Sequence, residues 1–303
     1  MGSLISKIRF YFKCFLYGAV TTGAGLYGVI ASIILKLLGK NEYSQYTVAR
    51  AFYYPFSWLS GVKITIKNEE RLHQRPAVVI SNHQSALDLL MLARIFQVGY
   101  TVTAKKALMY VPVLGWFMSA SGTFFLDRSK SDKARKVLEG ALKSLKRNHG
   151  SLFMFPEGTR SATKELDMLP FKKGAFHLAK QAGIPVLPCV VSNTSNIFDS
   201  KNKIFNSGEI IIEVLEPMST EGLETNEDVT KFTEQVRSKM LERLQALGYS
   251  KTPESSTPVP SASADTVPSE TISSAPAKSD TSSKKTRKSV SSEDITEATP
   301  LVA

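Results

Sequence analysis

The sequence has few of the residues that build disulfide frameworks or metal centres. Among 303 residues there are two cysteines, Cys14 and Cys189, and four histidines. Two cysteines cannot make a disulfide framework, which favours a reducing compartment or a membrane face. Three of the histidines, His73, His149 and His177, stand alone along the chain, so we expect no metal site.

Acidic residues are fewer than basic ones, so the formal net charge is +11. Such a balance indicates an anionic partner, which can be a nucleic acid, a phospholipid surface or a phosphorylated substrate. The sequence has no basic helix with base-reading spacing and no stacking motif for single strands. We therefore expect no nucleic-acid partner, and a phospholipid membrane or a phosphorylated substrate remains.

The N-terminal segment lacks charge where a membrane span would lie. Residues 14–35 contain no charged side chain, and basic residues flank them on both sides. This stretch is long enough to cross a bilayer and is longer than the apolar run of a signal peptide. Residues 51–61 are rich in aromatic side chains, which favour the lipid headgroup layer. We expect residues 1–60 to form a membrane anchor, either one span or a helical hairpin that dips into one leaflet.

A second uncharged run covers residues 107–126. It is long enough to span a bilayer, but Pro112, Gly115 and Gly122 interrupt it. A span here would also place the motifs before and after it on opposite sides of the membrane. We therefore expect this segment to be buried in the protein or to lie in the membrane interface.

From residue 62 the patterns of strands and helices alternate. Strands are predicted at 62–67, 77–80, 101–105, 123–126, 151–155, 186–192 and 209–215, and helices near 85–96, at 130–147 and over a final amphipathic stretch from Val229 to Leu247. This alternation is typical of an α/β fold. We expect a mostly parallel or mixed central sheet with helices on its faces, formed by residues 61–250.

The C-terminal composition differs from that of the rest of the chain. Residues 251–303 are rich in Ser, Thr, Pro and Ala and cannot bury enough apolar surface to order themselves. We expect a disordered tail. Ser289 follows basic residues, and Ser291 and Ser292 precede acidic ones, which predicts a phosphorylation site.

The candidate catalytic residues follow the apolar strand at 77–80. His83 precedes Asp88 by five positions, and on one helix two such residues would point about 140° apart. The two side chains can meet only if His83 lies in the loop and Asp88 in the first helical turn. Ser85 is the expected N-cap. Two interpretations fit: a Ser85–Asp88 capping box with His83 on the surface, or a His–Asp dyad.

Three further motifs follow at regular intervals. They are Gly122-Thr-Phe-Phe-Leu-Asp-Arg128, Phe153-Met-Phe-Pro-Glu-Gly-Thr-Arg160 and Ile184-Pro-Val-Leu-Pro188. In the second motif, Gly158 allows a tight turn, and Arg160 offers a planar fork of donors suited to phosphate. Taken singly, each motif also has an ordinary structural explanation as a strand end, a turn or a strand entry.

Together, the four motifs resemble in order those of the glycerolipid acyltransferase family. They are most similar to the 1-acyl-sn-glycerol-3-phosphate (lysophosphatidic acid) acyltransferases, and the hydrophobic start and Ser-rich tail resemble a fungal member. The motifs cover roughly residues 60–220. The resemblance implies an α/β domain with an N-terminal membrane-bound helical pair. It also implies transfer of a fatty acyl group from acyl-CoA to the sn-2 hydroxyl of lysophosphatidate, which gives phosphatidate.

His83 and Asp88 then have defined catalytic roles. An alcohol that attacks a thioester needs a base, and a neutral imidazole serves this purpose near physiological pH. Asp88 would fix the tautomer of His83 and stabilise the imidazolium. The sequence has no Gly-x-Ser-x-Gly elbow, so we expect neither an acyl-enzyme nor a cofactor other than the co-substrate acyl-CoA.

The acceptor phosphate needs cations near the catalytic pair. We expect Arg160 to bind it, with help from Lys105 or Arg128. The resemblance adds the other residues of the same turn to the substrate-binding set, which becomes Lys105, Arg128, Glu157, Gly158, Thr159 and Arg160.

Other functions stay open at this stage. The acceptor can be glycerol 3-phosphate or another lysophospholipid, and a lipid hydrolase or a CoA-independent transacylase would use the same dyad. A non-catalytic membrane-binding protein would need only the cap and the basic residues. An acyl-CoA donor implies a cytosol-facing site, so we expect the endoplasmic reticulum membrane, and a hairpin anchor would also allow lipid droplets.

Overall fold

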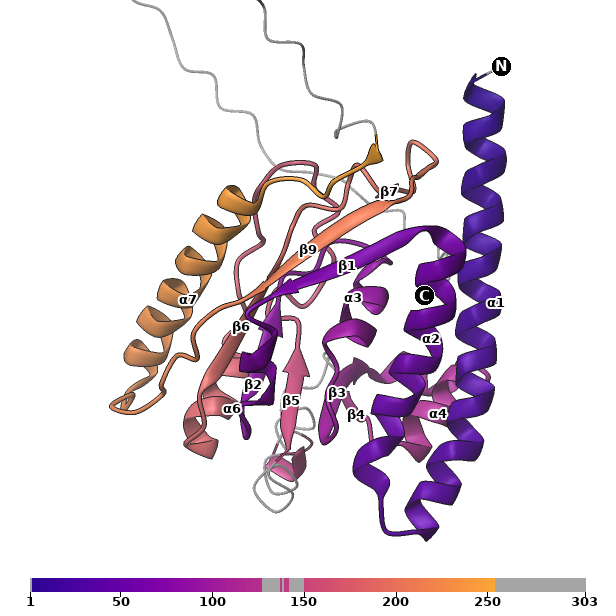
Figure 1. Cartoon of the computed structure of the whole chain (residues 1–303). Helices are drawn as coiled ribbons and strands as arrows, with labels where there is room; N and C mark the ends of the chain where they lie inside the picture. The colour runs from indigo at the N-terminus through magenta and orange to yellow at the C-terminus, as the bar shows by residue number, and fades with distance from the viewer. Residues whose placement is uncertain (1, 127–136, 138, 142–149, 254–303) are drawn as a thin grey trace, which may run out of the picture. The chain divides into compact units, whose positions relative to one another are not determined.

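Two helices begin the chain. A computed structural model describes residues 2–126, 137, 139–141 and 150–253, and Figure 1 shows its ribbon. Helix α1 (Gly2–Leu37) is joined to α2 (Ser44–Ser60) by the 3₁₀ turn η1 (Asn41–Tyr43). Within the described part of the chain, α1 is the one helix long and apolar enough to cross a membrane, over Leu4–Leu37.

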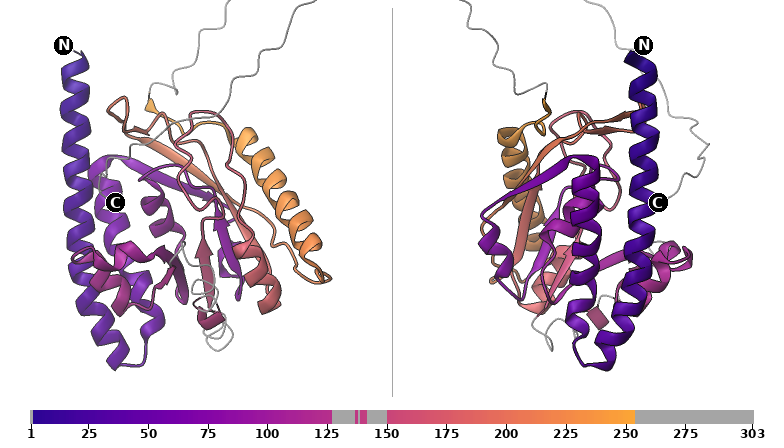
Figure 2. Two further views of the ribbon diagram at one scale, coloured as in Figure 1. Left: turned by 180° about the vertical axis from the view of Figure 1, so that it is seen from behind. Right: turned by 45° about the vertical axis from the view of Figure 1, so that its right-hand side comes forward.

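Helix α1 has two different faces. One face packs against α2 and α4 (Leu114–Ala120), and the helices lie side by side in both views of Figure 2. Close packing depends on Gly28, because a Cβ there would lie 2.6 Å from Phe117 and 2.7 Å from Val48. The other face exposes large apolar side chains, namely Leu4, Ile5, Ile8, Tyr11, Phe12, Phe15, Leu26, Tyr27, Ile30, Ile33, Ile34 and Leu37.

The rest of the fold is built on a seven-stranded sheet of order β1-β9-β6-β2-β5-β3-β4. Its strands are β1 (Val62–Lys67), β2 (Val78–Ser81), β3 (Tyr100–Lys105), β4 (Phe124–Leu126), β5 (Ser151–Met154), β6 (Val186–Val191) and β9 (Gly208–Val214). From β6 to β4 every neighbouring pair is parallel, whereas β9 is antiparallel to β6. The predicted fold class is confirmed, and the carboxyl ends of β2, β3, β4 and β5 share one edge of the sheet.

Helices cover both faces of this sheet (Figures 1 and 2). Val79 belongs to the core shared with α1, α2 and α3 (Asp88–Ile95). Its neighbours Val78 and Ile80 belong to the core shared with α6 (Gly174–Ala182) and α7 (Asn226–Leu247). Successive side chains of a strand point to opposite faces, so β2 is apolar on both sides.

The uncharged segment at 107–126 is not a single helix. It contains most of η3 (Lys106–Tyr110), α4 and β4, and a seven-residue helix is too short to cross a bilayer. The strand patterns did not predict α6, the turn η2 (Glu69–His73) or the hairpin of β7 (Phe198–Asp199) and β8 (Ile204–Phe205).

Several sequence-based predictions fall outside the described residues. Of the helix expected at 130–147, residues 137 and 139–141 are helical, and the others lie outside the described part. Also outside the described part lie Asp127, Arg128, His149, the phosphorylation site at 289–292 and almost all of the tail.

The glycines of α1 allow a paired stability test. Gly28→Ala should destabilise the protein by about 1–3 kcal/mol, because the added methyl group overpacks the contact with Phe117 and Val48. Gly23→Ala is the control, since a Cβ at Gly23 meets nothing within 4 Å. Thermal unfolding in detergent should show a midpoint several degrees lower for the first variant only. Equal midpoints would contradict the packing described above.

Candidate active site

The loop after β2 is fastened to β6 by two amide side chains. Asn82 accepts a hydrogen bond from the N–H of Val191 and donates one to its C=O, both at 2.9 Å. Gln84 forms three more bonds with main-chain groups of residues 191–194. Both side chains are buried. His83, between them, is therefore held on a rigid segment at the carboxyl edge of the sheet.

His83 and Asp88 are in direct contact. Nδ1 of His83 lies 2.6 Å from Oδ2 of Asp88. The same oxygen accepts the main-chain N–H groups of Gln84 at 2.6 Å and Ser85 at 3.0 Å. Because an ionised carboxylate only accepts, Nδ1 of His83 carries the proton and Nε2 is left as the basic nitrogen. Asp88 is 3% exposed and the side chain of His83 18%, so the imidazole has access to a substrate.

The predicted N-cap is wrong by two positions. Helix α3 begins at Asp88 and its N-cap position is Leu87, whereas Ser85 lies in the turn before it. The hydroxyl of Ser85 accepts the N–H of Leu87, not that of Asp88. The physical reason is the carboxylate of Asp88, which bonds the N–H groups before the helix and draws residues 84–87 into a separate turn.

The loop after β5 closes over His83 from the other side. Oε1 of Glu157 accepts the N–H of His83 at 2.7 Å, and the N–H of Ser161 donates to the C=O of His83 at 2.8 Å. The ring of Phe155 stacks on the imidazole, with centroids 3.9 Å apart. Oε2 of Glu157 accepts the N–H of Leu169 at 3.0 Å. Both main-chain groups and one ring face of His83 are thus fixed by this loop.

The described members of the expected substrate-binding set lie at the end of β3 and in the loop after β5, along the same edge, whereas Arg128 lies outside the described residues. Gly158 has a φ of +73°, and a Cβ there would lie 2.9 Å from the side chain of Lys172. Thr159 and Arg160, which follow it, are exposed. Lys105 is exposed at the end of β3. The site is therefore bordered by cations, and Lys172, from a basic pair that alone indicates no more than a solvated turn, is one of them.

Unlike Thr159 and Arg160 of the expected substrate-binding set, Glu157 is buried. Its carboxylate is buried and receives two main-chain N–H groups. Burial raises the pKa of Glu157, and the two N–H donors oppose this effect. This carboxylate therefore shapes the loop around His83, a role that only contacts between distant residues can reveal.

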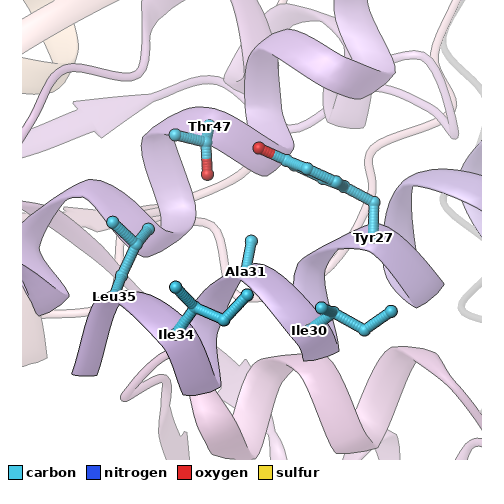
Figure 3. Close-up of a pocket in the computed structure, with 6 residues that line it drawn as sticks. All are labelled: Tyr27, Ile30, Ala31, Ile34, Leu35 and Thr47. Carbon is cyan, nitrogen blue, oxygen red and sulfur yellow. The ribbon is translucent and has the colours of Figure 1, made fainter. Parts of the chain in front are cut away.

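An apolar hollow of about 330 Å³ lies between α1 and α2 (Figure 3). Its lining residues are Tyr27, Ile30, Ala31, Ile34, Leu35 and Thr47. None of the candidate site residues lines it, so it belongs to the helical pair and not to the dyad.

Comparisons with known proteins give a consistent result. The family model described as Acyltransferase matches residues 63–192. The chain is 49% identical to the 1-acyl-sn-glycerol-3-phosphate acyltransferase of Saccharomyces cerevisiae, over 82% of each chain. It is 34% identical to the human 1-acyl-sn-glycerol-3-phosphate acyltransferase beta, over 81% of this chain and 86% of the human one.

Solved structures with a similar fold include the crystal structure of the 1-acyl-sn-glycerophosphate (LPA) acyltransferase PlsC from Thermotoga maritima, with a TM-score of 0.62 and 24% identity. The alignment covers 80% of this chain and 96% of that chain.

The buried carboxyl of Glu157 predicts a pH dependence of stability. Because its pKa is raised in the folded protein, the unfolded chain loses this proton at a lower pH. The contribution of Glu157 to stability is then largest below its ordinary pKa of 4.5 and falls as the pH rises through the raised value. Glu157→Gln cannot ionise. The difference in unfolding free energy, wild type minus variant, should decrease from about pH 4 to pH 7.

Unfolding midpoints across this pH range would measure that difference. Glu221→Gln, the same substitution at an exposed residue outside the site, is measured in parallel as a reference. A difference for Glu157→Gln that rises with pH would contradict the assignment.

Proposed function

Because the chain belongs to the 1-acyl-sn-glycerol-3-phosphate acyltransferase family, we propose that it transfers a fatty acyl group from acyl-CoA to the sn-2 hydroxyl of lysophosphatidate. The products are phosphatidate and free CoA. The observation that carries this proposal is the contact of His83 with Asp88, 2.6 Å long, at the carboxyl edge of the sheet. The reaction belongs to phospholipid biosynthesis.

The dyad suits a direct transfer. Nε2 of His83 takes the proton of the sn-2 hydroxyl while the oxygen attacks the thioester carbon. The tetrahedral intermediate then breaks the carbon–sulfur bond, and the CoA sulfur receives the proton from His83. Asp88 holds the imidazole in position and stabilises its charged form. The substrate hydroxyl takes the place of a nucleophilic serine, so this route has no acyl-enzyme and uses acyl-CoA as co-substrate.

The cations at the edge of the sheet suit the acceptor phosphate. Arg160 and Lys105 are exposed there, and both can donate to phosphate oxygens. Arg160 is only two residues beyond Gly158, in the loop that is bonded to His83. Such a site favours lysophosphatidate, and it can also receive other lysophospholipids, because their phosphates are bound in the same way.

The first helix suits attachment to a phospholipid membrane. Its exposed face is apolar, and Trp58 on α2 and Trp116 on α4 are 83% and 59% exposed. Indole side chains favour the membrane interface. We propose a site facing the cytosol on the endoplasmic reticulum membrane, and lipid droplets are a second location if the two helices dip into one leaflet.

Removing the base should abolish transfer. We expect His83→Ala to lower kcat by about 10²- to 10⁴-fold and Asp88→Asn by about 10²-fold or more. The assay uses purified protein in detergent, labelled oleoyl-CoA and lysophosphatidate, and measures both phosphatidate and free CoA. His73→Ala, at an exposed histidine of η2, is the matched control and should keep full activity. Normal turnover by His83→Ala, or product without CoA release, would overturn the mechanism.

Arg160 should act mainly on the acceptor. Arg160→Ala is expected to raise the KM for lysophosphatidate about ten-fold or more, because a charge-assisted bond to phosphate is lost. Arg160→Lys should fall between the variant and the wild type, since it keeps the charge without the fork of donors. Lys239→Ala, an exposed cation of α7, controls for net charge. A change confined to the KM for acyl-CoA would reassign Arg160 to the donor.

A further inference from the structure

The turn that precedes helix α3, which begins with Asp88, is bonded by α1. The hydroxyl of Tyr17 on α1 donates to the C=O of Ala86 at 2.9 Å. Ala86 lies in the turn between Ser85 and Leu87, so this bond reaches the segment that joins His83 to Asp88. The first helix thus contacts the dyad segment directly.

The position of this hydroxyl is fixed by packing. The ring of Tyr17 makes edge contacts with Phe52 and Phe56 of α2, with centroids 5.7 Å and 5.2 Å apart. Both phenylalanines are buried in the core that also contains Leu87 of the turn. An aromatic ring held on two sides presents its hydroxyl with little freedom.

The other end of α3 is bonded by α2. One guanidinium nitrogen of Arg50 donates to the C=O groups of Ala93 at 2.7 Å and Arg94 at 3.0 Å. The other donates to the C=O of Phe96 at 3.0 Å. The last carbonyls of a helix have no partner within it, so Arg50 supplies these acceptors with donors and places a positive charge at the negative end of the helix.

Helix α3 depends on such external bonds because it is short. It has eight residues, and a helix of this length is not stable alone in water. The apolar contacts of Leu90 and Met91 bury it but are not directional. The directional bonds to the turn before it and to its last carbonyl groups restrict its position along its axis, and with it that of the carboxylate of Asp88.

We propose that Tyr17 and Arg50 are positioning residues for acyl transfer. Tyr17 holds the turn before α3 and Arg50 holds the end of α3, and together they keep Asp88 within hydrogen-bond distance of His83. The N-terminal helices, in addition to binding the membrane, then set the geometry of the dyad. This inference rests on the proposed function, because it takes His83 and Asp88 as the reacting pair. A displacement of reacting groups by about 1 Å can cost a large part of the rate.

Tyr17→Phe and Arg50→Gln test the two bonds. The first keeps the ring contacts, and we expect kcat to fall about two- to ten-fold. The second removes three charge-assisted bonds, and we expect a loss of about ten-fold or more, partly restored by Arg50→Lys. The KM for lysophosphatidate should stay within about two-fold in each case, because neither variant changes a residue proposed to bind the acceptor phosphate.

Matched controls break bonds of the same chemistry away from α3. The hydroxyl of Thr21 donates to the C=O of Tyr17 at 2.7 Å within α1, and Arg71 donates to the C=O of Val214 at 2.8 Å. Thr21→Val and Arg71→Gln should keep the activity of the wild type. All variants should also sediment with phosphatidylcholine–phosphatidylserine vesicles as the wild type does. A loss of activity that follows a loss of vesicle binding would overturn the inference.

A double-mutant cycle gives the decisive readout. If Tyr17 and Arg50 act through the dyad, their substitutions should have little effect on the residual activity of Asp88→Asn. If the same fold-losses recur in that background, the two residues act by general destabilisation and the inference is wrong. Full activity of Asp88→Asn by itself would instead overturn the dyad mechanism, and a wild-type protein that transfers no acyl group would overturn the proposed function, so the failures are told apart.

Discussion

The candidate site depends on one carboxylate oxygen, Oδ2 of Asp88. It accepts the imidazole N–H of His83 and the main-chain N–H groups of Gln84 and Ser85. Breaking any of these bonds would leave a buried polar group without its partner, which is costly. The loop after β2 and the start of α3 therefore behave as one body. The amide of Asn82 attaches that body to β6, and the carboxylate of Glu157 attaches it to the loop after β5.

The spacing of His83 and Asp88 predicted their local geometry well. Five positions require the histidine in the loop and the aspartate in the first helical turn, and the structure has this arrangement. The N-cap position was predicted wrongly at Ser85. Residue preferences for caps do not take account of the hydrogen bond from the N–H of Ser85 to the carboxylate of Asp88. Strand patterns placed the sheet correctly, but they do not contain strand order or direction, so the reversal of β9 relative to β6 was not predictable.

Other residues of the site were hidden because their partners are distant in sequence. Glu157 lies 74 positions from His83, and its motif suggests a surface turn rather than a buried carboxylate. Tyr17 and Arg50 stand in segments whose composition indicates only affinity for a membrane. Composition does not tell which polar tip points inward, since Tyr17 and the exposed Tyr27 look alike in the sequence. Only the packed structure distinguishes them.

Helix α1 provides both the apolar surface proposed to meet the membrane and the hydrogen bond of Tyr17 to the turn before Asp88. The exposed face of α1 is apolar over most of its length, and the opposite face holds Gly28 against α4 and Tyr17 against the dyad turn. In the proposed function the substrate is a membrane lipid, so the surface proposed to meet the bilayer and the groups proposed to react should be connected rigidly. The exposed apolar face of α1 and the face that holds Tyr17 are separated by one helix diameter, about 10–12 Å. A rotation of α1 about its axis would therefore also move the hydroxyl of Tyr17 away from Ala86, so the proposed membrane attachment and the proposed dyad share one structural element.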